Sequence, residues 1–311
     1  MDLLFIVLGF LLLVFGGDML LKSAIGISLR LNIPKIVIGM TVVSFATSLP
    51  ELIVSVNAAL DGHPDIALGN VIGSNIANLG LVLAITNLLS PIIIKPGFYK
   101  VDWPVMMISS VLLCGFIAFD GVLQRYEGVI LFSFLIIFMV FLLKFQKPAV
   151  EEEVLEYKVK LPLLKIILFL VIGGIALWIG SELLIDGAVG IAKRFNVSER
   201  VIGVTIISVG TSVPELAASV IAVLKKEKGI SIGNLIGSNV FNILGVLGLT
   251  AIIAPINIID QRLLTNDIFW MLATALIVLP LSFMFVRMKL GWKEGLIQLF
   301  VYSIFIYGMF F

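Results

Sequence analysis

Residues 37–60, VIGMTVVSFATSLPELIVSVNAAL, recur at 201–224 as VIGVTIISVGTSVPELAASVIAVL. The two segments are identical at 14 of 24 positions, and the matches include Gly, Ser, Thr, Pro and Glu as well as apolar residues. A shift of 164 positions also aligns residues 66–78 with 230–242. The chain therefore contains an internal duplication, with one copy in each half.

The composition around these segments is that of a membrane protein. Of 311 residues, 60% are hydrophobic and 13% are charged, against roughly 45–50% and about 25% in soluble domains. A spanning helix needs about 20 apolar residues, and the chain has ten such apolar segments: 3–21, 36–60, 66–94, 103–119, 128–143, 163–185, 201–224, 230–256, 268–286 and 295–311. We expect an all-α polytopic protein of about ten transmembrane helices, surrounded by the lipid bilayer and compatible with a monomer. The net charge of +1 gives no indication of nucleic-acid binding.

The duplication predicts two halves of opposite orientation. Residues 1–143 form the first five-helix repeat, 144–162 an acidic linker and 163–311 the second repeat. Because five is odd, the second repeat enters the membrane from the other side. With the N-terminus outside, 16 Lys and Arg residues fall inside and 5 outside, although the basic loop 193–200 is then external. The positive-inside rule therefore places both termini outside and the linker in the cytoplasm. Inverted repeats are typical of secondary transporters whose substrate binds near the membrane midplane.

Two carboxylates lie in the middle of apolar segments. Glu51 and Glu215 occupy equivalent positions in the repeats, and no Lys or Arg lies within two helical turns of either along the sequence. A charge at the bilayer centre costs about 2.5–3.5 kcal/mol and marks function by default. We therefore expect a bound cation or a proton as the partner of each carboxylate.

Hydroxyl groups and a proline accompany each glutamate. In the first repeat, the polar side chains recur at steps of three or four residues on one helix face: Thr41, Ser44, Ser48, Glu51 and Ser55, with Thr47 at the border. Such a stripe lines a path or site, unless the hydroxyls only bond their own backbone. Pro50 and Pro214 precede the glutamates and predict breaks that free backbone carbonyls. Oxygen donors of these kinds suit calcium, magnesium or sodium.

The following segments, 66–78 and 230–242, share a Gly-Ser-Asn pattern. Ser74 and Asn78 are four residues apart, so both can offer oxygens on the same helix face. For Asn70 and Asn75, interhelical packing is as good an explanation as ion binding. Asp18 and its equivalent Glu182 are expected near helix ends, where they anchor the interface.

These motifs resemble the alpha repeats of the calcium/cation antiporter superfamily, in particular its sodium/calcium exchanger branch. The match is to Thr-Ser-x-Pro-Glu at 47–51 and 211–215, and to Gly-Ser-x-x-x-Asn at 73–78 and 237–242. The resemblance implies that calcium and sodium share Glu51 and Glu215 as ligands. It also implies that the adjacent sites are completed by side chains of Thr47, Ser48, Thr211, Ser212, Ser74, Ser238, Asn78 and Asn242 and by carbonyls near Ser44 and Ser208.

The resemblance implies a function as well. Some relatives carry Asp where this chain has Asn242, an acid associated with potassium use, and proton-coupled relatives tend to have Gly-Asn-x-x-Glu instead of Thr-Ser-x-Pro-Glu. We therefore expect an alternating-access antiporter that exchanges calcium for sodium at a midplane all-oxygen site, potassium-independent, without a cofactor and without enzymatic activity. A proton/calcium antiporter using the same glutamates is the alternative, and an intramembrane hydrolase and a passive cation channel are more distant ones.

Overall fold

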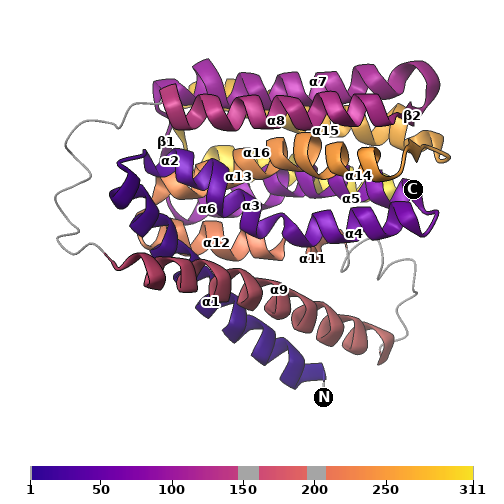
Figure 1. Ribbon diagram of the computed structural model, residues 1–311. Helices are drawn as coiled ribbons and strands as arrows, with labels where there is room; N and C mark the ends of the chain where they lie inside the picture. The colour runs from indigo at the N-terminus through magenta and orange to yellow at the C-terminus, as the bar shows by residue number, and fades with distance from the viewer. Residues whose placement is uncertain (1, 146–160, 195–207, 311) are drawn as a thin grey trace. The chain divides into compact units, whose positions relative to one another are not determined.

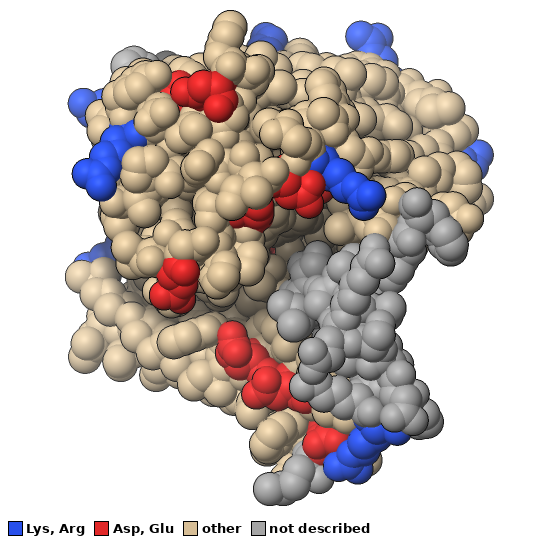
Figure 2. All heavy atoms as spheres, turned by 90° about the vertical axis from the view of Figure 1, so that its right-hand side faces the viewer, with Lys and Arg blue, Asp and Glu red and all other residues tan. Residues whose placement is uncertain are grey.

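The computed structural model describes residues 2–145, 161–194 and 208–310, and it is almost entirely helical (Figure 1). By length and apolar composition, seven helices of the described part can cross a membrane, or eight if one bent pair counts as a single span. Large apolar side chains such as Phe10, Leu11 and Ile175 are exposed on the helices. Even at the helix ends drawn in Figure 2, most of the surface is uncharged. The chain is therefore an all-α polytopic membrane protein.

The chain divides into two compact units, and each combines segments of both repeats. Unit 1 comprises Met1–Thr47 and Met139–Asn234, and unit 2 comprises Ser48–Phe138 and Leu235–Phe311. The predicted linker 144–162 lies mostly outside the described residues.

Unit 1 is built on helices from the start of each repeat. Its elements are α1 (Asp2–Leu31), α2 (Lys35–Ile38), the π-helix η1 (Gly39–Val43), α3 (Ser44–Thr47), α9 (Leu163–Arg194), α11 (Ser208–Gly210), α12 (Val213–Leu224), the end of α8 (Arg125–Phe145) and the start of α13 (Lys228–Phe241). Apolar residues of α1, α9 and α12 form its core, among them Leu20, Leu177 and Ala222.

Helices α1 and α9 pack closely and run in opposite directions. A Cβ atom at Gly9 would lie 2.7 Å from the Gly180 carbonyl oxygen, and one at Gly16 would lie 2.8 Å from that of Gly173. Because residue numbers rise along one helix and fall along the other at these contacts, the pair is antiparallel. Glycine permits this backbone approach, as in other close helix pairs of membranes. Since Gly16 and Gly180 are equivalent in the duplication, equivalent helices of the two repeats point in opposite directions.

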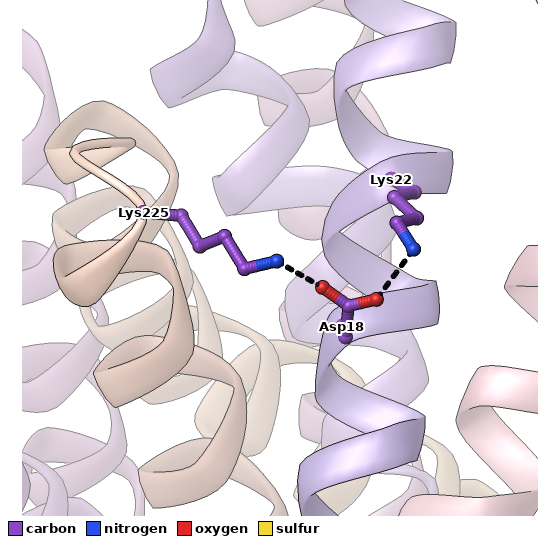
Figure 3. Close-up of polar contacts among 3 residues, drawn as sticks. All are labelled: Asp18, Lys22 and Lys225. Atoms are coloured by element: carbon purple, nitrogen blue, oxygen red, sulfur yellow. Dashed lines mark hydrogen bonds and ion pairs between the residues drawn. The ribbon is translucent and has the colours of Figure 1, made fainter.

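Both α1 and α9 extend beyond their predicted ends, so the expectation that Asp18 and Glu182 lie near helix ends was wrong. Helix α1 continues to Leu31, because the polar residues that end an apolar segment do not end a helix. Asp18 lies inside α1 and forms ion pairs with Lys22 at 2.6 Å and with Lys225 at 2.5 Å (Figure 3). Asp18 thus forms a bridge between α1 and the C-terminal end of α12, and anchoring of the membrane interface by Asp18 stays a prediction.

Unit 2 contains the remaining helices and two short β ladders. Its elements are α4 (Leu49–Leu60), α5 (Pro64–Ala77), η2 (Asn78–Val82), α6 (Leu83–Leu89), β1 (Ile92–Ile93), η3 (Phe98–Asp102), α7 (Trp103–Asp120), β2 (Val122–Leu123), most of α8, the rest of α13, η5 (Asn242–Leu247), α14 (Gly248–Ile253), β3 (Ile256–Asn257), η6 (Leu263–Asp267), α15 (Ile268–Met284), β4 (Lys289–Leu290) and α16 (Trp292–Phe310). The ladders are antiparallel: Ile92 pairs with Leu290, and Val122 pairs with Asn257. Each ladder ties a loop of the first repeat to a loop of the second.

Candidate ion-binding site

Both glutamates stand at the start of a new helix after a break. The predicted span at 36–60 is broken between Thr47 and Leu49, where Ser48 has φ −89° and ψ 7°. Ser212 has nearly the same values, φ −86° and ψ 3°. Proline is well tolerated in the first turn of a helix, where its missing N–H has no intrahelical partner to lose. The predicted breaks are confirmed, and they place Glu51 and Glu215 in the first turns of α4 and α12.

Both carboxylates lie where backbone N–H groups converge at the start of a helix. Both glutamate side chains are fully buried, Glu51 in unit 2 and Glu215 in unit 1. The first turn of a helix presents backbone N–H groups and the positive end of the helix dipole, which stabilise a nearby anion. Burial in a poorly polarisable medium, in turn, makes a cation a strong partner for such a group.

In unit 1, Asn234 joins predicted ligands of the first repeat to the helix of Glu215. Thr47 Oγ1 donates to Asn234 Oδ1 at 3.2 Å, and Ser44 Oγ donates to the Asn234 carbonyl at 3.2 Å. Asn234 Nδ2 donates in turn to Ser219 Oγ at 3.0 Å, one helical turn after Glu215. Asn234 thus connects Ser44 and Thr47 of the first repeat with Ser219 of the second.

A close helix crossing makes these contacts with Asn234 possible. A Cβ atom at Gly39 would lie 2.6 Å from the Ile230 carbonyl oxygen and 3.0 Å from the Asn234 nitrogen. Ser44 Oγ also lies 2.7 Å from the Gly39 carbonyl oxygen and Thr47 Oγ1 lies 3.2 Å from that of Val43, so each hydroxyl shares its single hydrogen among more than one acceptor. Because a hydroxyl oxygen keeps its lone pairs when it donates its hydrogen, these oxygens remain able to bind a cation.

Unit 2 repeats one of these contacts, that between the asparagine and the serine, beside Glu51. Asn70 Nδ2 donates to Ser55 Oγ at 3.0 Å and to the Glu51 carbonyl at 3.3 Å. Asn70 and Ser55 are the equivalents of Asn234 and Ser219 in the duplication. Sequence reasoning did not assign either asparagine to the site; their position 19 residues after a buried glutamate in both repeats was the available signal.

Two equivalent asparagines mark π-helical turns in unit 2. The π-helix η2 begins at Asn78 and η5 begins at Asn242, and π-helical turns are frequent at functional sites. Both side chains are fully buried. Asn242 Nδ2 donates to Ser74 Oγ at 3.1 Å, so two of the predicted ligands are in contact. Within the described residues, Asn242 Oδ1 and both amide atoms of Asn78 have no hydrogen-bond partner.

The other predicted residues have the following places. Ser48 and Ser212 lie at the two helix breaks and are buried, Ser238 is buried in α13, and Thr211 is half-buried. Ser208 begins α11, but its side chain lies outside the described part. Among the described residues, Thr41 donates to the Val37 carbonyl of its own helix at 2.8 Å, which agrees with the backbone-bonding alternative for this residue.

The donors in both units are carboxylate, hydroxyl, amide and carbonyl oxygens. Within the described residues, no group of three or more His, Cys, Asp or Glu side chains could hold a metal ion. Oxygen donors select hard cations, whereas zinc and copper prefer nitrogen and sulfur. Membrane-spanning helices, helix breaks with buried carboxylates and oxygen donors from a duplicated sequence define a membrane transporter of hard cations.

The chain belongs to the sodium/calcium exchanger branch of the calcium/cation antiporter superfamily. The model of the sodium/calcium exchanger protein family matches residues 1–144 and 165–311. CaxA of Alkalimonas amylolytica, which is named as an antiporter, is 39% identical over 96% of this chain and 95% of its own. The sodium/calcium exchanger MaX1 of Methanosarcina acetivorans is 30% identical over 99% of this chain and 98% of its own.

The fold agrees with this membership. The structure of the sodium-calcium exchanger NCX_Mj matches with a TM-score of 0.84 and 30% sequence identity, over 98% of both chains. The chain is therefore a calcium/cation antiporter and a transporter rather than an enzyme.

Proposed function

We propose that this chain exchanges calcium for sodium across the cell membrane by alternating access, with Glu51 and Glu215 binding the same cations. The observation that carries the proposal is the duplicated helix break, which places one buried carboxylate in the first turn of α4 and one in that of α12. Two carboxylates are neutralised by one calcium ion or by two sodium ions. Competition of the two ions for shared ligands couples their movements, because the site is rarely empty during a crossing.

Neutral oxygens complete the proposed ligand set. Thr47, Thr211, Ser48 and Ser212 lie at the helix breaks, and Ser74, Ser238, Asn78 and Asn242 lie on the helices that follow. The carbonyls near Ser44 and Ser208 are the remaining donors. The contacts of Asn234 and Asn242 support this set within each unit, because they show that hydroxyl and amide groups of different helices gather around the predicted positions.

The proposed topology has ten helices in two inverted repeats, with both termini outside and the linker in the cytoplasm. Antiparallel packing of the equivalent helices α1 and α9 supports the inversion. The contacts between loops also support it. The β1–β4 ladder and the Lys35–Glu227 ion pair each join two loops predicted to be inside, whereas the β2–β3 ladder and the Asp65 contact with the Ile259 nitrogen each join two loops predicted to be outside.

Transport by carboxylate variants tests the proposal. In proteoliposomes, we expect Glu51→Gln and Glu215→Gln each to reduce sodium-driven uptake of radioactive calcium to the level of protein-free liposomes, because one negative charge cannot neutralise either cargo. Glu182→Gln is the matched control, since Glu182 is an exposed glutamate in α9. Full uptake by either site variant would contradict the proposed site.

Imposed gradients test the coupling ion. We expect an outwardly directed sodium gradient to drive calcium uptake in the wild-type protein, and a proton or potassium gradient alone to drive none. Calcium uptake driven by protons without sodium would instead support a proton/calcium antiporter with the same glutamates. Acceleration of calcium efflux by sodium on the opposite side distinguishes exchange from a passive channel.

A further inference from the structure

The side chain of Asn242 can face a cation in two ways, and only one of them is useful. Its amide has a carbonyl oxygen that can bind a cation and an NH₂ group that cannot. The NH₂ group donates to Ser74 Oγ and to Asn75 Oδ1, both at 3.1 Å. Because the two ends of an amide lie on opposite sides of its carbon, these bonds turn Oδ1 of Asn242 away from Ser74 and Asn75. This oxygen is buried and has no hydrogen-bond partner in the described part of the chain.

A backbone carbonyl determines which way both amides point. Asn75 Nδ2 donates to the Asn239 carbonyl at 3.2 Å, and its other neighbour is the Met271 sulfur at 3.9 Å. A carbonyl can only accept, so Asn75 must present its NH₂ group to it and its Oδ1 to Asn242. Ser74 Oγ already donates to the Val71 carbonyl at 3.1 Å, and it too can only accept from Asn242. Asn242 is therefore held with its NH₂ group toward two acceptors.

Among the residues that the structure describes, the equivalent contact is absent from the other half of the duplication. Asn78 corresponds to Asn242, and Asn239 corresponds to Asn75. Asn239 Nδ2 faces the Met106 sulfur at 3.9 Å, as Asn75 faces that of Met271. Within the described residues, however, Asn239 Oδ1 and the amide of Asn78 have no hydrogen-bond partner. In the described part of the chain, these hydrogen bonds thus orient Asn242 but not its equivalent, Asn78.

We propose that Asn75 is a positioning residue that aims the carbonyl oxygen of Asn242 at the transported cation. The inference rests on the proposed function, in which Asn242 is a ligand. Asn75 does not belong to the proposed ligand set. The inference nevertheless gives it an effect on cation affinity, which it exerts through Asn242. A neutral ligand must be held in orientation by its neighbours, whereas a carboxylate offers an oxygen on either side.

The test compares two matched alanine variants. We expect Asn75→Ala to raise the half-saturating concentration of calcium or of sodium at least threefold, with the maximal exchange rate within twofold of wild type. Asn239→Ala is the control: Asn239 is equally buried, faces a methionine in the same way and keeps its backbone carbonyl after substitution. We expect it to leave both half-saturating concentrations within twofold of wild type. Equal changes in the two variants would overturn the inference in favour of a packing role.

Variants of Asn242 show whether Asn75 acts through it. In an Asn242→Ala background, we expect the further substitution Asn75→Ala to change the half-saturating concentrations less than twofold, because no amide remains to be oriented. The same holds in an Asn242→Asp background, where both side-chain oxygens can bind. A full threefold effect of Asn75→Ala in either background would overturn the inference. Failure of the proposed function is distinguishable, since Glu51→Gln would then leave exchange intact.

Discussion

Two lysines of unit 1 form ion pairs of similar length in different surroundings. Lys35 contacts Glu227 at 2.8 Å, and their side chains are only 14% and 8% exposed. Lys225 contacts Asp18 at 2.5 Å, and these side chains are 53% and 26% exposed. Water competes for the second pair and hardly reaches the first. At the scale of single residues, burial therefore decides what each pair contributes to stability.

Methionine substitution of each lysine tests this difference. We expect Lys35→Met to lower the free energy of unfolding by about 3 kcal/mol, because Glu227 is left as a buried charge without its cation. Lys225→Met should cost at most about 1 kcal/mol, since Asp18 keeps Lys22 and water. Thermal unfolding in detergent measures both. Equal losses would show that burial does not govern these pairs.

Sequence spacing predicted which residues are polar and buried, but it did not predict which of them touch. Ser44, Ser48 and Glu51 were predicted from steps of three and four residues, and all three are fully buried. Asn234 was not predicted as the residue that joins Thr47 to Ser219. Its partners are 187 and 15 residues away in the chain, and spacing along one helix carries no information about such contacts.

Close packing of α1 against α9 depends on the glycines at their contact. A Cβ atom at Gly173 would lie 2.8 Å from the Leu20 nitrogen, whereas one at the adjacent Gly174 would meet nothing within 4 Å. Gly173 and Gly174 are adjacent in the same helix, so substitutions at these two positions can be compared directly.

We expect Gly173→Ala to destabilise the protein by about 1–3 kcal/mol, because the helices must separate to admit the methyl group. Gly174→Ala should be neutral or stabilise by up to about 1 kcal/mol, since alanine favours the helix. Melting temperatures of the two variants in the same detergent provide the comparison. A stable Gly173→Ala protein would contradict the contact between the backbones.

Helix breaks were more predictable than helix ends. Pro50 and Pro214 act on the turn directly before them, so their effect can be read from sequence alone. The end of α1 was misplaced by ten residues, at 21 instead of 31, because Lys22 interrupts an apolar segment without interrupting backbone hydrogen bonds.

At the scale of the whole molecule, the inversion of the repeats predicts opposite exposure of equivalent loops. Asp61 directly follows α4. Its equivalent in the second repeat is Lys225, and Lys226 is the residue after that. Asp61 and Lys226 are both exposed. The chain has a single cysteine, Cys114, so a Cys114→Ser background permits labelling at one chosen position.

In intact cells, we expect Asp61→Cys in this background to react with a membrane-impermeant thiol reagent, and Lys226→Cys to react only after permeabilisation. The positive-inside count predicts this direction, and the odd number of helices in each repeat predicts that the two positions differ. Labelling of both positions from the same side would contradict the inverted topology.

By itself, the sequence determined the membrane class, the duplication, the two helix breaks and the glutamates beside them. These are properties of composition and of residues a few positions apart, and local chemistry decides them. Only the tertiary structure decided that α1 packs against α9, that Asn234 joins two helices and that Asn242 donates to Asn75. Each of these depends on which helix faces meet, and that choice is made by the packing of side chains from segments more than a hundred residues apart.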